Sequence, residues 1–417
     1  MNLERLYTAF TNSTGVTTDS RKIEEGAMFF ALHGASFDGN NYAIAALEQG
    51  ASVAVIDRED ILSSNPHYAE ELILVEDTLQ ALQALAREHR RELAMPIIAI
   101  AGSNGKTTTK ELVSRVLAEK FEVSTTKGNL NNHIGVPLTL LAMSSETEFG
   151  VVEMGASAQG EIALLCSIAE PNYGILTNIG LSHLEGFGGV EGIRKGKGEL
   201  FDHLDLNGGR AFVPQEDKVL ASMAAERNDL AVEYYSRSIS EGFESNLTGD
   251  YNRYNIAAAV EIGRYFGIDD RHIADAILSF KPDNNRSQAV KTERNQLVVD
   301  CYNANPSSME AALDNISTME AEHKVLILGD MLELGEWSEE AHINILSKAD
   351  KVAERILLVG KEFANAHGKS EGLQSFYSLY PTTNEALTAL DEEPISGALV
   401  LLKGSRGIKL ETLIPKL

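Results

Sequence analysis

Cysteine and long apolar runs are scarce in this sequence. The two cysteines, Cys166 and Cys301, lie far apart and form no CxxC motif. This excludes a disulfide framework, and we expect two buried core residues in a reducing compartment. The longest apolar stretches, such as 96–101 and 397–402, fall well short of the roughly 20 residues of a membrane span. The first residues lack a basic flank and an apolar run, so we expect no signal peptide and a cytoplasmic location.

Positive charge is also in short supply. The 417 residues include 36 Lys and Arg against 61 Asp and Glu, a net charge of −25. A phosphate backbone or an anionic membrane requires a dense cationic surface, so we expect neither nucleic acid nor membrane as a partner. Any phosphate must then be bound in a small local pocket of backbone N–H groups, lysine and metal.

The length and the apolar fraction of 43% indicate two or three globular domains with sizeable cores.

Apolar runs alternate with amphipathic segments along most of the chain. This alternation predicts the α/β class with parallel sheets, arranged as three domains at 1–80, 81–284 and 285–417. Strands are expected at 26–32, 52–56, 97–101, 150–153, 175–178, 296–301, 324–328, 355–359 and 398–402. Helices are expected at 42–49, 78–94 and 251–280, and from Lys106 and Pro306 onward. Pro96 and the segment 281–285 mark the expected domain junctions.

The most specific local pattern is a glycine-rich turn between the strand 97–101 and the helix that begins at Lys106. In such a turn, backbone N–H groups and the helix N-terminus face a phosphate. Lys106 would reach the β- and γ-phosphates of a nucleotide, and Thr107 would hold Mg²⁺ directly or through water. The spacing departs from GxxxxGK[ST], because Ile100 stands where the first glycine would fall. An ordinary glycine-rich turn is the alternative, but the strand–turn–helix context favours nucleotide binding. The loop residues are Gly102, Ser103, Asn104, Gly105, Lys106, Thr107 and Thr108.

Two further polar residues follow expected strands. Glu153 ends one strand and His183 follows another, at the edge where α/β sheets place their chemistry. Beside a phosphate loop, both are candidate metal ligands. The alternatives are that Glu153 caps a helix and that His183 belongs to a surface loop. Lys195 and Lys197 lie in a charged run that is typical of a solvated helix face.

Several blocks of the sequence resemble the ATP-dependent Mur ligases. They are GSNGKTT at 102–108, NLNNHIGVP at 129–137, EMGAS at 153–157, TNIGLSHLEGFG at 177–188 and KGKGELF at 195–201. Blocks at 18–42, 300–313, 328–335 and 401–411 resemble the branch of that family that joins D-alanyl-D-alanine to UDP-N-acetylmuramoyl-tripeptide. The resemblance covers essentially the whole chain in order. It implies a small N-terminal α/β UDP-binding domain, a central ATPase-like parallel sheet and a C-terminal Rossmann-like domain.

The resemblance also implies roles for residues around the nucleotide. Lys106, His183 and Lys197 are the implied catalytic residues. ATP would be bound by the phosphate loop together with Asn252, Asn255 and Arg286, and Mg²⁺ by Thr107, Glu153, His183 and a carbamylated Lys197. A free ammonium beside divalent cations would be repelled, whereas its carbamate is an anion that binds them. Gly196 stands where the family usually has Ala, and Asn285 where it commonly has Gly.

For the other substrates, the resemblance implies one contact segment in each domain. Asp19, Ser20 and Arg21 would bind the uridine diphosphate, and Asn131 and Asn132 the nucleotide sugar. Contacts with the dipeptide and ATP would come from Asp300, Asn303, Asn305, Lys403, Ser405 and Arg406. A simple turn or helix cap is the alternative for the Asp-Ser pair, and an ordinary basic loop is the alternative for 403–406. The third residue of the tripeptide is either meso-diaminopimelate or lysine, and the resemblance implies a monomer.

The implied reaction forms an acyl phosphate on the tripeptide carboxylate, which the dipeptide amine then attacks. A sister ligase that adds another amino acid, or a folylpolyglutamate-type ligase, is the nearest rival, and the blocks at 18–42 and 300–313 argue against the folate branch. A P-loop NTPase that drives movement has no need for His183 and Lys197. A nucleotide-binding regulator without activity has no physical reason to keep Lys106 and Glu153 beside them.

Overall fold

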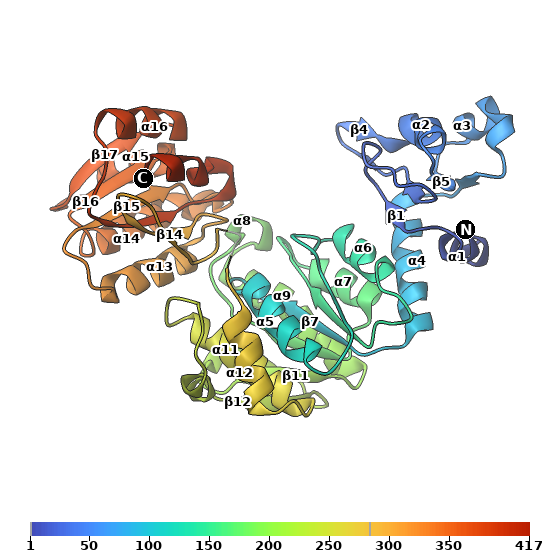
Figure 1. The fold of residues 1–417 in the computed structure, drawn as a ribbon, viewed down its shortest axis with the longest axis horizontal. Helices are drawn as coiled ribbons and strands as arrows, with labels where there is room; N and C mark the ends of the chain where they lie inside the picture. Colours follow the sequence, from blue (N-terminus) through green and yellow to red (C-terminus); the bar gives the residue numbers. More distant parts are fainter. Residues whose placement is uncertain (1, 283–284) are drawn as a thin grey trace.

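Residues 2–282 and 285–417 are described by the computed structural model, which has three lobes, each built on one main sheet (Figure 1). The predicted α/β class with three units is confirmed. The boundary predicted at residue 80 falls within a continuous helix, α4 (Thr78–Leu93). The other predicted boundary, at residue 284, lies outside the described residues. Both domain boundaries therefore stay predictions.

The N-terminal lobe has a parallel sheet with the strand order β1-β2-β5-β6. Its strands are β1 (Val16–Thr17), β2 (Met28–Phe30), β5 (Val53–Ile56) and β6 (Leu72–Leu74), with a small antiparallel hairpin of β3 (His33–Gly34) and β4 (Phe37–Asp38). Its helices are α1 (Leu3–Thr11), η1 (Gly39–Tyr42), α2 (Ala43–Glu48), α3 (Glu59–Ser64) and η2 (Pro66–Tyr68). The central strands β2 and β5 are almost entirely buried.

Helix α4 joins this lobe to the central one (Figure 1). At its first residue, Thr78 donates its N–H to Asp57 Oδ2 at 3.1 Å. Near its other end, Arg90 Nε donates to the carbonyl of Ala169, 3.0 Å away in the central lobe. The helix ends at Ala94, which adopts a left-handed conformation with φ 53°. Side chains therefore fasten α4 to both lobes.

The central lobe has six parallel strands in the order β12-β11-β10-β7-β9-β8. They are β7 (Ile97–Ala101), β8 (Val123–Thr125), β9 (Phe149–Glu153), β10 (Tyr173–Leu176), β11 (Arg210–Pro214) and β12 (Ala231–Tyr235). The helices are α5 (Lys106–Ala118), α6 (Gly135–Leu141), α7 (Glu161–Ala169), α8 (Leu184–Phe187), α9 (Val190–Leu206), α10 (Lys218–Ala225), η3 (Arg237–Gly242), α11 (Asn252–Tyr265) and α12 (Asp270–Ser279).

Helices cover both faces of the central sheet, which explains its apolar strands. In β7, Ile98 and Ile100 pack on the side of α5, α11 and α12, whereas Ile97 and Ala99 belong to the core on the side of α6, α7 and α9. Because all six strands are parallel, their carboxyl ends lie along one edge, and the loops that follow β7, β9 and β10 lie there together. The strand predicted at 175–178 is instead β10 (Tyr173–Leu176).

The C-terminal lobe has a six-stranded sheet in the order β13-β14-β18-β15-β16-β17, parallel except for the β13–β14 pair. Its strands are β13 (Gln288–Lys291), β14 (Gln296–Asp300), β15 (Lys324–Gly329), β16 (Arg355–Val359), β17 (Phe376–Tyr380) and β18 (Leu399–Lys403). Its helices are α13 (Pro306–Thr318), η4 (Gly335–Trp337), α14 (Ser338–Ala349), α15 (Lys361–Lys369), α16 (Thr383–Glu392), η5 (Arg406–Ile408) and η6 (Leu410–Lys416). The N-cap Asn305 and Pro306 start α13 at the predicted place.

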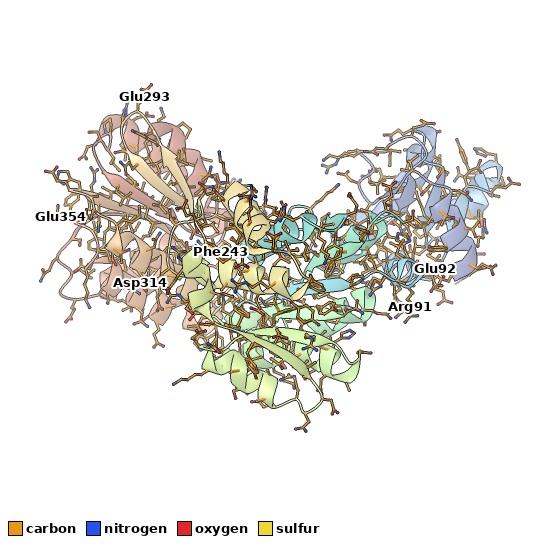
Figure 2. The ribbon with its side chains drawn as sticks, turned by 60° about the horizontal axis from the view of Figure 1, so that its bottom comes forward. Arg91, Glu92, Phe243, Glu293, Asp314 and Glu354 are labelled. Atoms are coloured by element: carbon orange, nitrogen blue, oxygen red, sulfur yellow. The ribbon has the colours of Figure 1, made fainter. Side chains whose placement is uncertain are left out.

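Composition and structure agree on several absences. Cys166 and Cys301 are both free and buried, as predicted. In the described part of the chain, no helix is both long and apolar enough to cross a membrane. Acidic side chains such as Glu293 and Glu354 lie on the outside of the C-terminal lobe (Figure 2). Much of the excess negative charge is therefore carried by the outer surface.

Candidate functional site

A cavity of about 900 Å³ lies between the central and C-terminal lobes. Within the described residues, its wall begins at Ser103, and the N-terminal lobe contributes nothing to it. Most of the predicted site residues line this cavity together: Ser103, Asn104, Gly105, Lys106, Thr107, Thr108, Asn131, Asn132, Glu153, His183, Asn252, Asn255, Arg286, Asp300, Asn303, Asn305, Lys403, Ser405 and Arg406. Gly102, Lys197, Asp19, Ser20 and Arg21 are not part of its wall.

The phosphate loop is braced by the residues that follow β10. Gly102 has φ 125°, and a methyl group there would lie 2.2 Å from Thr177 Oγ1, so only glycine fits. Thr177 Oγ1 donates to the carbonyl of Asn104 at 2.6 Å, and Asn178 Oδ1 accepts the N–H of Asn104 at 3.1 Å. These two bonds explain why 177–178 leave the strand predicted at 175–178. The loop conformation is therefore fixed by the protein itself.

Lys106 lies at the start of α5 with its ammonium curled back over this loop. Nζ donates to the carbonyls of Gly102 and Ser103, each at 2.9 Å. The pKa of Lys106 is lowered to about 8, chiefly by burial; the charge of Glu153 opposes this shift and the charge of Arg286 adds to it. Both hydrogen bonds go to carbonyls, so neither neutralises the positive charge. The cation is available to an anion in the cavity.

Glu153 lies at the end of β9 with its side chain 1% exposed. Its Oε1 accepts a hydrogen bond from Asn131 Nδ2 at 2.7 Å, whereas Oε2 is buried and no group in 2–282 or 285–417 donates to it. A buried carboxylate oxygen without a donor is costly unless a ligand satisfies it. The alternative of a helix cap does not describe Glu153, which ends a strand. Glu153 lines the cavity, so its Oε2 is a candidate ligand for a cation bound there.

His183 precedes α8 in a left-handed conformation with φ 53°. Its Nδ1 contacts the carboxylate of Glu333, which comes from the C-terminal lobe and has φ 62°. Such backbone conformations are uncommon outside glycine and gather at functional sites. Sequence reasoning did not single out Glu333 as a site residue. Its pairing with His183 depends on how two lobes meet.

Lys197 and Lys195 have opposite environments on α9. Lys195 is exposed, as a solvated helix face predicts, but Lys197 is 1% exposed. Lys197 Nζ donates to the carbonyl of Ala156 at 3.0 Å and lies 4.9 Å from the centre of the Phe187 ring. Burial holds the pKa of Lys197 well below its usual range, and the Lys106 charge adds to this. Lys197 lies just behind the cavity wall, of which Ala156 is a part.

The predicted metal ligands do not form a complete site of protein side chains alone. In the part of the chain that the structure describes, no three His, Cys, Asp or Glu side chains are grouped closely enough to hold a metal ion. Thr107, Glu153 and His183 all line the cavity, and Glu153 Oε2 has no hydrogen-bond partner among the described residues. Oxygen donors of this kind suit Mg²⁺, which usually completes its shell with water and phosphate. The magnesium assignment stays a prediction.

In the C-terminal lobe, strand order explains a buried ion pair. Asp300 ends β14 and Lys403 ends β18, and the two residues are paired in register. Lys403 Nζ lies 2.8 Å from Asp300 Oδ2 and donates to the carbonyl of Asn303 at 2.9 Å. Ser405 is also buried, and its hydroxyl accepts the N–H of Leu332 at 3.0 Å. An ordinary exposed basic loop therefore does not describe this segment.

Asn305 connects the two lobes. Its side chain caps α13 by accepting the N–H of Ser308 at 2.9 Å. The same side chain donates through Nδ2 to Asn104 Oδ1 at 2.8 Å. Close by, the N–H of Leu181 donates to Ser307 Oγ at 2.9 Å. The phosphate loop is thus hydrogen bonded directly to the C-terminal lobe.

Two arginines surround one aromatic ring at the cavity. The guanidinium of Arg286 lies 3.6 Å from the centre of the Tyr302 ring, and its Nε is buried with no hydrogen-bond partner among the described residues. Arg406 donates through Nη1 to the Tyr302 hydroxyl at 3.1 Å. Sequence reasoning named both arginines but missed Tyr302. Its position within the matched block at 300–313 was the available signal.

The predicted asparagines are braced rather than free. Asn255 Oδ1 accepts a hydrogen bond from Thr109 at 3.1 Å, and its Nδ2 donates to Asn252 Oδ1 at 2.8 Å. Asn132 Oδ1 accepts the N–H of Gly135 at 2.8 Å, at the start of α6. Both segments reach the cavity wall. Their predicted contacts with ATP and the nucleotide sugar stay predictions.

Asp19, Ser20 and Arg21 lie in the N-terminal lobe, away from this cavity. Arg21 Nε donates to Asp19 Oδ1 at 2.8 Å, and hydrogen bonds from Arg21 lower the pKa of Asp19 to about 2. Asp19 Oδ1 also accepts the N–H of Arg21 at 3.1 Å, which is the turn that the simpler interpretation predicts. The Arg21 side chain is 84% exposed. It is accessible to an anionic ligand.

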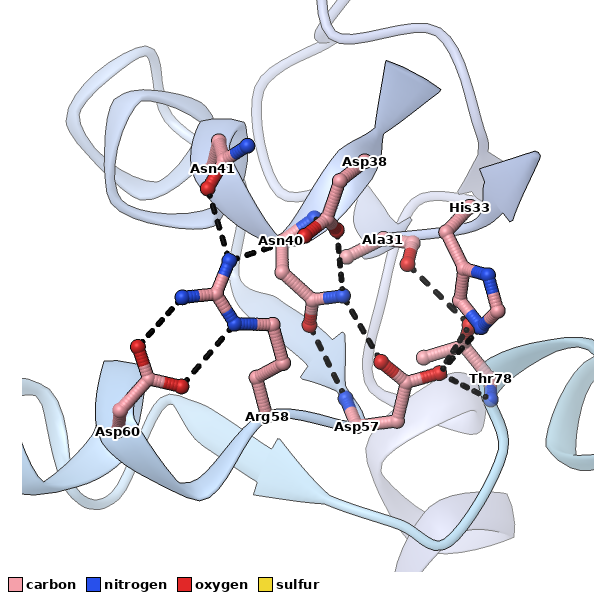
Figure 3. A network of polar contacts seen from close by, with 9 residues as sticks. All are labelled: Ala31, His33, Asp38, Asn40, Asn41, Asp57, Arg58, Asp60 and Thr78. Atoms are coloured by element: carbon pink, nitrogen blue, oxygen red, sulfur yellow. Dashed lines mark hydrogen bonds and ion pairs between the residues drawn. The ribbon is translucent and has the colours of Figure 1, made fainter. Parts of the chain in front are cut away.

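A second polar cluster in the N-terminal lobe has a different character (Figure 3). At its centre Asp57, 7% exposed, accepts hydrogen bonds from Asn40 Nδ2 at 2.8 Å and from the Thr78 hydroxyl at 3.1 Å. His33 Nε2 lies 3.3 Å from the same carboxylate. Arg58 is paired with Asp38 at 2.9 Å. This cluster holds the β3–β4 hairpin and the start of α4 together.

Comparison with known proteins places this arrangement in a family. Residues 12–90 match the description "Mur ligase family, catalytic domain", 100–243 match "Mur ligase middle domain", and 285–406 match "Mur ligase, glutamate ligase domain". A Bacillus subtilis protein named UDP-N-acetylmuramoyl-tripeptide–D-alanyl-D-alanine ligase is 36% identical, with 97% of this chain and 93% of that protein aligned. The chain belongs to the Mur ligase family. The expectation drawn from the sequence blocks is confirmed.

Solved structures of Mur ligases have the same architecture. A crystal structure of MurF from Acinetobacter baumannii matches with a TM-score of 0.86 and 29% identity, covering 100% of this chain and 98% of that one. MurF ligase from Thermotoga maritima in complex with ADP matches with a TM-score of 0.83 and 26% identity, covering 98% and 97%. The three-lobed Mur ligase architecture therefore extends over the whole chain.

Proposed function

We propose that this Mur ligase joins D-alanyl-D-alanine to UDP-N-acetylmuramoyl-tripeptide with the conversion of ATP to ADP and phosphate. The observation that carries the proposal is the cavity between two lobes, where a braced phosphate loop faces the loops that end β14 and β18. The proposal is supported by relatives with that name over nearly the full length. A related structure contains ADP, which supports ATP as the co-substrate.

In the first step, the terminal carboxylate of the tripeptide attacks the γ-phosphate in line, the bond between the γ-phosphate and ADP breaks, and an acyl phosphate and ADP are formed. Lys106 and the N–H groups at the start of α5 would stabilise the charge that develops on the phosphate. Arg286, whose Nε has no hydrogen-bond partner, would add a second cation on the C-terminal side. The amine of the dipeptide then attacks the acyl carbon, and phosphate leaves as the amide forms.

Mg²⁺ would be held by Thr107, Glu153, His183 and the carbamate of Lys197. The fit rests on Glu153 Oε2, a buried carboxylate oxygen with no donor. When bound, Mg²⁺ neutralises phosphate charge and orients the transferring group. Lys197 is suited to carbamate formation because its buried amine has a lowered pKa. The neutral amine, whose lone pair can attack CO₂, is therefore more accessible than in an exposed lysine.

The remaining substrate contacts would come from two places. Asp19, Ser20 and Arg21 would bind the uridine diphosphate, with Asn131 and Asn132 nearer the reacting end. Asn303 and Arg406 would face the dipeptide. We also propose a monomer, as the resemblance of the sequence blocks to the Mur ligases implies. The net charge of −25 supports the proposal that nucleic acid is not a partner. We also propose a cytoplasmic location.

One assay tests the proposal. The protein is incubated with ATP, Mg²⁺, UDP-N-acetylmuramoyl-tripeptide and D-alanyl-D-alanine, while ADP release and the mass of the UDP product are followed. We expect ADP only when UDP-N-acetylmuramoyl-tripeptide and D-alanyl-D-alanine are both present, with a matching amount of UDP-muramoyl-pentapeptide. D-alanine alone, L-alanyl-L-alanine and the dipeptide amide serve as acceptor controls. Release of ADP when the tripeptide substrate or the dipeptide is left out, or absence of the pentapeptide, would overturn the proposal.

A further inference from the structure

Phe187 is a buried aromatic residue to which the proposed mechanism gives no role. It ends α8, the single helical turn that follows His183, and it is 2% exposed. Its N–H donates to the carbonyl of His183 at 3.0 Å, which closes that turn. Its own carbonyl accepts a hydrogen bond from Gln159 Nε2 at 3.1 Å. The backbone of Phe187 is therefore fixed directly beside a predicted metal ligand.

Two glycines of α9 leave the space that Phe187 occupies. A methyl group at Gly192 would lie 1.8 Å from the carbonyl oxygen of Phe187. A methyl group at Gly196 would lie 2.5 Å from Cε1 of the Phe187 ring. Glycine inside a helix costs stability relative to alanine. At both positions this cost is offset, because only glycine leaves room for Phe187. The Gly196 that replaces the usual alanine is explained by the ring against it.

The other end of this contact is Lys197. The Phe187 ring centre lies 4.9 Å from Nζ of Lys197, the residue that follows Gly196. Lys197 Nζ is in turn hydrogen bonded to Ala156, three residues after Glu153. A methyl group at Gly186, beside Phe187, would lie 2.2 Å from the carbonyl oxygen of Ser157. The three segments that bear Glu153, His183 and Lys197 thus meet around Phe187.

We propose that Phe187 is a positioning residue that sets the separation of His183 and Lys197, with Gly192 and Gly196 as its socket. The inference rests on the proposed function, because it concerns the residues assigned there to Mg²⁺. Phe187 touches neither substrate nor metal in this role. It acts by holding α8 against α9, so that a shift of its ring moves one ligand relative to the other.

A double-mutant cycle tests the contact between the ring and the socket. The four proteins are the unmodified enzyme, G196A, F187L and G196A/F187L. Leucine lacks the Cε1 atom that a methyl at position 196 would meet, so the double variant removes the clash. The control is G198A, which makes the same Gly→Ala change on α9, where the nearest atom is the flexible end of Arg227 at 2.9 Å.

Three quantities are measured for each protein. They are the Mg²⁺ concentration for half-maximal rate, Mn²⁺ binding by electron paramagnetic resonance with a non-hydrolysable ATP analogue, and the carbamate signal in ¹³C NMR after incubation with ¹³C-bicarbonate. Lys197→Ala gives the blank for the carbamate signal. Circular dichroism checks that each variant is folded, and the KM for D-alanyl-D-alanine serves as a parameter that the inference leaves unchanged.

We expect G196A to weaken Mn²⁺ binding about tenfold and to raise the Mg²⁺ requirement equally, as is typical when the support of a metal ligand is lost. F187L should weaken Mn²⁺ binding less than G196A does. The double variant should bind Mn²⁺ as F187L does, and should not show the sum of the two single losses. G198A should match the unmodified enzyme. Additive losses in the double variant, or unchanged metal binding in a folded G196A, would overturn the inference while the pentapeptide assay still supports the function. An unmodified enzyme without ligase activity would overturn the function, and this inference with it.

Discussion

Two polar regions of this protein are built in opposite ways. In the N-terminal lobe, Asp57 is buried but accepts hydrogen bonds from Asn40 and Thr78 (Figure 3). At the cavity between the central and C-terminal lobes, Glu153 Oε2 and Arg286 Nε are buried without partners. Native folds rarely leave such atoms unsatisfied. The N-terminal cluster is thus satisfied within the protein, whereas the cavity keeps polar atoms that a ligand can satisfy.

The largest effect is expected from the cation of the phosphate loop. Replacing Lys106 by methionine removes the charge over the loop but keeps a similar side-chain length. We expect kcat for pentapeptide formation to fall on the order of 10³-fold, the loss typical of a group that stabilises transition-state charge. Lys195→Met is the matched control, because Lys195 is exposed, and it should retain full activity. Equal activity of the two variants would remove Lys106 from the site.

The second prediction separates the two lysines of α9. Lys197→Ala should reduce kcat on the order of 10²-fold, and short carboxylic acids should partly restore it because they can occupy the place of the carbamate. Lys195→Ala should do neither. The measurement is the initial rate with increasing formate or acetate. Restored activity in Lys197→Ala would support the carbamate, and full activity without added acid would contradict it.

The third prediction concerns the N-terminal cluster. Asp57→Ala removes the acceptor of the Thr78 N–H. It also removes one of two acceptors of the Asn40 amide, which keeps Asp38, and of the Thr78 hydroxyl, which keeps the carbonyl of Ala31. We expect a loss of about 2–3 kcal/mol in the free energy of unfolding, measured by urea denaturation. At a temperature where the variant is folded, kcat should change less than twofold. A large fall in kcat with unchanged stability would break the distinction between the two regions.

The smallest expected effect is a pH dependence. The pKa of Lys106 is lowered from its ordinary value to about 8, so the side chain is charged below that pH and loses its charge above it. Because kcat/KM reports the free enzyme, kcat/KM for ATP should be nearly constant below about pH 7.5 and about tenfold lower at pH 9. Lys106→Arg, which does not titrate in this range, should lose this decline. A decline that persists in that variant would assign it to another group.

Local signals in the sequence were sufficient for the framework of the site. The strand at 97–101 was predicted to the residue, and the following helix was predicted to start near Lys106, where it does start. Glycine, lysine and a β-rich run determine both within a few positions. The same holds for α13, where Asn305 and Pro306 provide a cap and a first helical residue. Motifs of this kind depend little on the rest of the chain.

Other features depend on contacts between distant segments, which no local pattern contains. Lys195 and Lys197 look alike in the sequence, and only the packing of Phe187 against α9 distinguishes them. The pairing of Lys403 with Asp300 follows from β18 lying beside β14. The contact between His183 and Glu333 requires two lobes to meet. Each of these is a consequence of tertiary arrangement.

Helix α4 acts as a spacer of defined length between the N-terminal lobe and the rest of the protein. Its 16 residues, at a rise of about 1.5 Å each, extend over about 24 Å. One end is hydrogen bonded to Asp57 in the N-terminal lobe, and the other end, through Arg90, to Ala169 in the central lobe. The helix itself therefore sets the spacing, without a flexible linker. An insertion or a deletion within α4 would therefore shift the N-terminal lobe relative to the central one by about 1.5 Å along the helix for each residue.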